Sequence, residues 1–79
     1  MSQTLPSLSW REIEPALRRA GFVYAPKRGK GSHRAYTRVD AVGIRRLAIV
    51  PMGKDVPRGT MHSILQQAGM TSDEFLRYL

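Results

Sequence analysis

The sequence predicts an α+β fold, a two-layer sandwich in which helices pack on one face of a three-stranded antiparallel sheet. Segments with helical apolar spacing flank a central block of short β-rich runs. Strands this close in sequence pair as an antiparallel meander. A chain of 79 residues supports one modest core, so we expect a single domain over residues 1–79, with residues 1–8 as a flexible N-terminus.

The first helix is expected to follow Ser9, which can form a capping box with Glu12 three residues later. Gly21 is placed to end it. Pro15 falls inside this segment, where proline removes a hydrogen bond, so the regular helix either starts near Pro15 or kinks there. Four apolar residues mark its buried stripe: Trp10, Ile13, Leu17 and Ala20.

Three strands should follow, over residues 22–26, 33–39 and 44–51, separated by turns at 27–32 and 40–43. After a loop over 52–59, Thr60 is expected to cap a second helix that Gly69 ends. Thr71 and Glu74 form a capping box for a last helical turn. The resulting α-β-β-β-α-α order is also that of double-stranded-RNA-binding domains.

Charge indicates the class of partner. Thirteen Lys and Arg stand against six Asp and Glu, a net charge of +7, and seven of the thirteen lie between Lys27 and Arg46. This block predicts contact with the RNA backbone; the alternatives are a solvated basic face and an acidic protein partner. The residues expected to bind phosphate are Lys27, Arg28, Lys30, Gly31, Ser32, Arg34, Arg38, Arg45 and Arg46.

His33 is the candidate for proton transfer. Backbone N–H groups at Gly31 and Ser32 can hold an anion, and an imidazole beside it titrates near neutral pH. RNA supplies its own nucleophile, the 2′-hydroxyl. The alternative is an exposed residue at a strand end. Tyr36 should lie on the opposite strand face by parity, and His62 should be an ordinary residue of a helix surface.

Metal and cofactor sites are not expected. The chain has no cysteine, its two histidines are far apart, and its six acids are scattered without a paired-carboxylate pattern. The N-terminus lacks the features of a signal peptide, and the longest apolar run is too short to cross a bilayer. We therefore expect a soluble, intracellular protein that does not enter membranes.

Four short motifs in order suggest a family. They are AGF at 20–22, GSH with a tyrosine three residues later at 31–36, VP at 50–51, and GT..SIL.QAGMT..EF...L at 59–79. Together they resemble the HicA-type (YcfA-like) mRNA interferase toxins of bacteria. The resemblance implies a double-stranded-RNA-binding-like fold, metal-independent cleavage of mRNA in the bacterial cytoplasm, and an acidic HicB-type antitoxin that covers the active face.

In this resemblance the family's catalytic histidine corresponds to His33, and its glycine-rich turn to Gly31 and Ser32. The chain differs from many members in the loop VPMGKD, which has no second histidine, so a two-histidine acid–base pair would need His62 to move in. The leading hypothesis is an endoribonuclease toxin. The rivals are a non-catalytic RNA-binding module and a protein-interaction domain.

Overall fold

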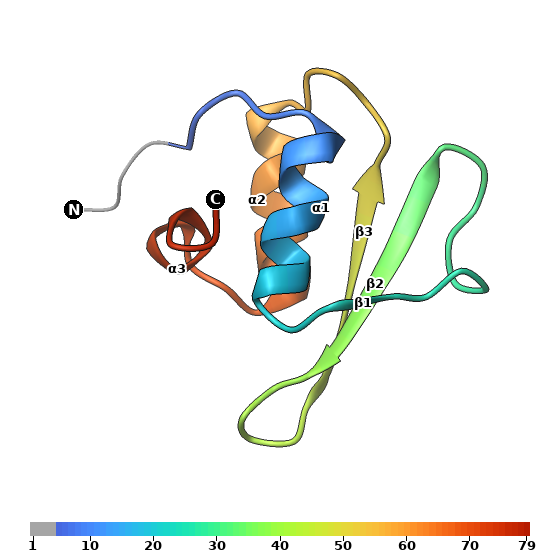
Figure 1. The fold of residues 1–79 in the computed structure, drawn as a ribbon, viewed down its shortest axis with the longest axis vertical. Coiled ribbons are helices and arrows are strands. Elements are labelled where there is room, and N and C mark those ends of the chain that lie inside the picture. The colour runs from blue at the N-terminus through green and yellow to red at the C-terminus, as the bar shows by residue number, and fades with distance from the viewer. Residues whose placement is uncertain (1–4) are drawn as a thin grey trace.

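The computed structural model describes residues 5–79, and it confirms the predicted α+β architecture. The three strands form one antiparallel sheet in the order β1-β2-β3. Figure 1 shows α1 and α2 on the same side of this sheet. The elements are α1 (Trp10–Arg19), β1 (Val23–Tyr24), β2 (His33–Val39), β3 (Arg45–Pro51), α2 (Arg58–Ala68) and α3 (Ser72–Leu76).

Helix α1 begins where the capping box predicts. The Ser9 N–H donates to Glu12 Oε1 at 3.1 Å, and the Ile13 N–H bonds to the Ser9 carbonyl at 3.1 Å. A regular first turn therefore precedes Pro15, and the alternative of a helix that starts near Pro15 is wrong. At the other end Gly21 adopts φ 98°, which suits glycine, as the chain turns into the sheet.

Strand β1 is shorter than the predicted 22–26. Phe22 is buried in the core, and Pro26 has no N–H to give to a ladder, so only Val23 and Tyr24 count as strand. The Ala25 N–H still bonds to the Ala35 carbonyl at 2.8 Å, which holds the segment against β2. Strand β3 starts one residue later than predicted.

Helix α2 starts earlier than predicted. Pro57 is its N-cap, and the Met61 N–H bonds to the Pro57 carbonyl at 2.9 Å, so Thr60 lies inside the first turn and does not cap the helix. Its end at Gly69, with φ 69°, is as predicted. The capping box before α3 is also confirmed, because the Glu74 N–H donates to Thr71 Oγ1 at 3.1 Å.

The core lies between the helices and one face of the sheet. Tyr36, Ala48 and Val50 face it from β2 and β3, together with the apolar stripes of α1 and α2. Side chains alternate between the two faces along a strand. Within β2, Arg34 therefore lies on the same face as Tyr36, whereas His33 lies on the other face.

Residues 5–8 pack against the domain, in contrast to the flexible N-terminus expected over 1–8. Leu5 and Leu8 are only 3% exposed, and the Val56 N–H bonds to the Leu8 carbonyl at 2.8 Å. The other half of that expectation, residues 1–4, lies outside the described residues.

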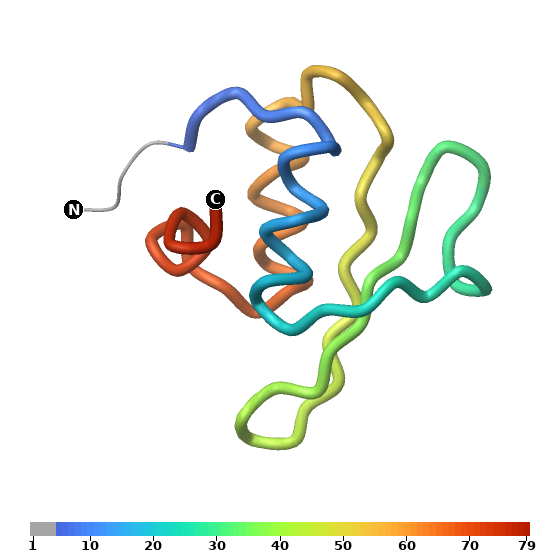
Figure 2. Tube along the Cα trace, in the orientation of Figure 1, coloured from blue at the N-terminus to red at the C-terminus, as the bar shows by residue number. Residues whose placement is uncertain are grey.

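The two ends of the sheet differ. At one end the β2–β3 hairpin extends away from the helices, and at the other the loop of residues 25–32 leads into β2 (Figure 2). At the outer edge of β3 the Ile49 N–H donates to Oε1 of Gln67 on α2, at 2.8 Å. In the described part of the chain, no helix has both the length and the apolar character that crossing a membrane requires.

Candidate functional site

A tight hairpin turn sets the start of β2. The Lys30 N–H bonds to the His33 carbonyl at 3.1 Å, and the His33 N–H returns a bond to Lys30 at 2.9 Å, which leaves only Gly31 and Ser32 in the loop. Gly31 has φ 57°, as the first central residue of a type II′ turn requires, and a Gly–Ser pair suits that turn. The sequence therefore fixes where the His33 backbone lies.

The same turn leaves backbone donors free. Among the described residues, neither the Gly31 nor the Ser32 N–H donates to another protein group, and both residues are exposed. The Ser32 carbonyl accepts from the Met52 N–H at 2.8 Å, which ties the turn to the end of β3. Two adjacent free N–H groups on a fixed turn can bind one anion.

His33 is exposed beside this turn, at the end of the sheet. Its partner across the ladder is Pro51, so the GSH and VP motifs, far apart in sequence, meet here. Within residues 5–79 the imidazole has no hydrogen bond or ion pair. Both ring nitrogens are thus available to a ligand.

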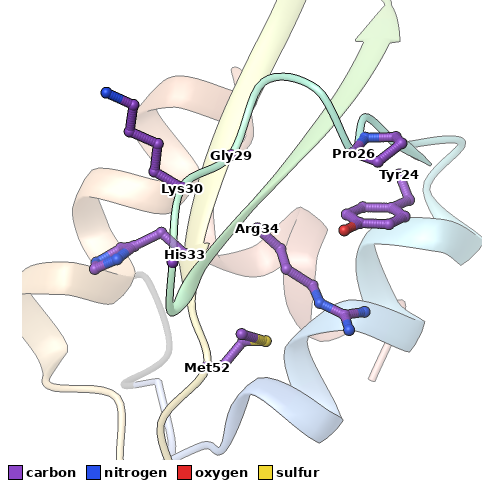
Figure 3. A pocket seen from close by; sticks show the side chains of 8 residues that line it. Tyr24, Pro26, Gly29, Lys30, His33, Arg34 and Met52 are labelled. Carbon is purple, nitrogen blue, oxygen red and sulfur yellow. The ribbon is translucent and has the colours of Figure 1, made fainter.

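A small polar pocket of about 220 Å³ lies at this end of the sheet. Figure 3 shows the His33 and Lys30 side chains pointing to one side of the start of β2, whereas Arg34 and Tyr24 lie on the other side. Eight residues line the pocket: Tyr24, Pro26, Gly29, Lys30, Gly31, His33, Arg34 and Met52.

Gly29 allows the turn to lie directly on β2. A Cβ atom at this position would be 2.5 Å from the His33 carbonyl oxygen and 3.1 Å from the Ala35 nitrogen. No side chain fits there unless the backbone moves. The absence of a side chain at Gly29 therefore controls how closely the turn, with its free N–H groups, approaches the strand that carries His33.

Arg34 is anchored on the helix-facing side. Its guanidinium lies over the rings of Trp10 and Tyr24, at 5.1 and 5.0 Å from their centroids, and 3.6 Å from Glu14 Oε2. Glu14 also accepts a hydrogen bond from the Tyr36 hydroxyl and pairs with Arg18 at 3.4 Å. Its single carboxylate is thus shared by two arginines and compensates only part of the charge of Arg34.

The pKa values of this cluster are shifted in opposite directions. The hydrogen bond from Tyr36, with help from Arg18 and Arg34, lowers the pKa of Glu14. Burial, and then the bond to Glu14, raises the pKa of Tyr36 to about 12. Tyr36 is fully buried and on the other strand face from His33, as predicted. Its hydroxyl group donates a hydrogen bond to Glu14, so Tyr36 serves the core and not proton transfer at His33.

The remaining predicted phosphate ligands are dispersed. Arg38 donates to the Ala20 carbonyl at 2.7 Å and lies over Phe22, and Arg46 pairs with Asp40 at 3.0 Å. A hydrogen bond from the Ile44 N–H, followed by Arg46, lowers the pKa of Asp40. The structure thus brings Lys30, Gly31 and Arg34 to the pocket with His33, but not Arg38 or Arg46. Ser32 lies in the adjacent turn and does not line the pocket.

Three of the predicted phosphate ligands outside the pocket are exposed. Lys27 and Arg28 lie in the loop that leads to the Lys30 turn. Arg45 is at the far end of β3, six residues from the partner of His33, or roughly 20 Å along the strand. These three could contact an extended polyanion at separate points.

Sequence reasoning missed Tyr24, Pro26, Gly29 and Met52 as residues of the pocket. Met52 could have been found, because it follows the VP motif that pairs with GSH.

His62 is exposed on α2, as predicted. Among residues 5–79, no three His, Cys, Asp or Glu side chains come together in a way that could hold a metal ion.

The site combines the imidazole ring of His33 with backbone N–H groups that can bind an anion and with nearby cations. This arrangement suits proton transfer next to a bound phosphate group.

No curated protein matches the chain significantly. The family model described as the HicA toxin of bacterial toxin–antitoxin matches residues 10–70, most of the chain and all of the pocket. The chain therefore belongs to the HicA toxin family, and its resemblance to these toxins of toxin–antitoxin systems is confirmed.

Proposed function

We propose that this toxin is a metal-independent endoribonuclease that cleaves mRNA, with His33 as general acid or base. One observation carries the proposal most: the exposed imidazole lies beside the free N–H groups of Gly31 and Ser32 at the rim of a polar pocket. A phosphate bound at the turn would bring its neighbouring ribose within reach of the ring.

The reaction needs no external nucleophile. The 2′-hydroxyl loses its proton to a base and attacks phosphorus, a new 2′-oxygen–phosphorus bond forms, and the bond to the 5′-oxygen breaks. The leaving oxygen takes up a proton, and a 2′,3′-cyclic phosphate remains. His33 serves one of the two proton transfers, and water serves the other. The turn N–H groups and Lys30 stabilise the charge on the phosphorane.

RNA binding is assigned first to those of the predicted phosphate ligands whose side chains have no hydrogen bond or ion pair within residues 5–79, namely Lys27, Arg28, Lys30 and Arg45. Arg34, Arg38 and Arg46 remain in the proposed set, but each must share its charge with an internal contact. We take the protein to act in the cytoplasm of a bacterial cell. There an acidic HicB-type antitoxin would bind the same cations and cover His33.

The test is a comparison of His33→Ala with His62→Ala, which replaces the other exposed histidine, on α2. Loss of a general acid or base should slow cleavage by about 100- to 10,000-fold, whereas His62→Ala should cleave like the native protein. Cleavage should persist in excess EDTA and leave cyclic phosphate ends.

Undiminished cleavage by folded His33→Ala would refute the role of His33. A strict requirement for magnesium, with 5′-phosphate products, would refute the metal-independent mechanism. Tight binding of RNA by the native protein without any cleavage would favour the non-catalytic RNA-binding module instead.

A further inference from the structure

We propose that the ring of Tyr24 is a stacking platform for a nucleobase of the bound RNA, on the side of the pocket opposite the His33 side chain. The inference rests on the proposed function only in taking the ligand to be RNA. It adds a base-binding subsite to a site otherwise described by phosphate contacts and proton transfer.

The first observation is the position of the ring. Tyr24 is 38% exposed, although it belongs to the sheet, and it lines the same pocket as His33. In Figure 3 its ring lies beside Pro26 and above the Arg34 guanidinium, across the start of β2 from the imidazole. A nucleotide chain that passes over this end of the sheet would meet His33 on one side and Tyr24 on the other.

The second observation is that the ring is held in place. Tyr24 packs against its ladder partner Tyr36, with centroids 5.7 Å apart and planes inclined by 43°. Tyr36 is fully buried and donates its hydroxyl hydrogen to Glu14. The Arg34 guanidinium, 5.0 Å from the Tyr24 centroid, is itself fixed between Trp10 and Glu14. Little conformational freedom remains to be lost when a base stacks here.

The third observation is the division of charge across β2. On the His33 side lie free N–H groups and Lys30, which suit a phosphate. On the Tyr24 side, Arg34 and Arg18 share the carboxylate of Glu14, so this surface presents flat rings and a planar guanidinium whose charge is partly compensated. Proteins bind unpaired RNA bases by stacking on such aromatic rings and arginine planes.

The test measures RNA binding in the His33→Ala background, so that cleavage does not interfere. The variants are Tyr24→Phe, Tyr24→Leu and, as matched control, Val23→Ala, the neighbouring exposed residue of β1 on the other face. Loss of one stacked base should weaken binding of single-stranded RNA by about 5- to 150-fold in Tyr24→Leu. Tyr24→Phe and Val23→Ala should bind like the parent protein.

A second series distinguishes stacking from a structural role. In this series each RNA oligonucleotide carries one abasic nucleotide, at a different position in each oligonucleotide. The parent protein should bind weakly when the missing base is the one that would stack on Tyr24. With that oligonucleotide, the parent protein and Tyr24→Leu should bind equally. A merely structural effect of Tyr24 would weaken binding of every oligonucleotide alike.

Three results would overturn the proposal. The first is undiminished RNA binding by Tyr24→Leu, and the second is an equal loss of binding affinity with every abasic oligonucleotide. The third is a loss of antitoxin binding alone, which would assign Tyr24 to a protein interface. Failure of the proposed function is detected separately, as native protein that binds RNA but does not cleave it. In that case the RNA-binding measurements still test base stacking on Tyr24.

Discussion

Replacement of Gly29 by alanine should impair cleavage far more than its small size suggests. The added Cβ would be 2.5 Å from the His33 carbonyl oxygen, whereas ordinary contacts of this kind begin at 3.4 Å. The turn must therefore lift from β2 by at least about 0.5 Å, and by about 0.9 Å to restore an ordinary contact. The same carbonyl accepts the Lys30 N–H, so the movement also weakens the bond that closes the hairpin.

Two quantities should change. Forced overpacking of this kind costs about 1–3 kcal/mol in the free energy of unfolding. Displacement of the anion-binding turn from His33 by about 1 Å should slow cleavage on the order of 100-fold. The assays are urea unfolding followed by circular dichroism, and single-turnover RNA cleavage corrected for the folded fraction.

Gly53→Ala is the matched control, because Gly53 has an ordinary φ and nothing lies within 4 Å of its added Cβ. It should unfold and cleave like the native protein. If Gly29→Ala also behaves like the native protein in both assays, close packing of the turn on β2 does not determine the geometry of the site.

Tyr36→Phe should lower the free energy of unfolding by about 1.5–3 kcal/mol, since Glu14 loses a hydrogen bond. Folding raises the pKa of Tyr36 from 10.0 to about 12, so its contribution is complete below pH 10 and is lost as pH rises toward 12. Urea unfolding across that range should show a steeper loss in the native protein than in Tyr36→Phe, and equal slopes would contradict this. The antitoxin should compete with RNA and associate more slowly as salt rises. Binding of RNA to the preformed complex as tightly as to the free toxin would contradict masking of His33.

Local signals predicted most of the fold. The capping boxes at Ser9 and Thr71 and the stop at Gly69 depend on a few neighbouring residues, and each is present in the structure. The start of α2 was mispredicted because Thr60 is a good cap by type, whereas Pro57 already supplies the extended backbone that begins a helix. Local preference cannot rank two such candidates.

The candidate site was less predictable, because its composition does not reveal which charges are free. Arg38 and Arg46 belong to the basic block in the sequence, yet each is held by a partner brought close only by folding. Arginine stems also cover apolar surface, as Arg38 does over Phe22. The role of Gly29 could not be predicted either, because its contact with β2 arises from tertiary packing.

The contact between Gln67 and Ile49 limits how another chain can join this sheet. At the outer edge of β3 one N–H is occupied by that side chain, and Pro51 has none to give. At the opposite edge β1 has two residues and is soon followed by Pro26. Neither margin offers a long row of donors for strand addition, a protection against edge-to-edge aggregation. Strand addition is then a poor mode of recognition for an antitoxin. Side chains, which can diverge between toxins of the same fold, are better suited to match each toxin to its own partner.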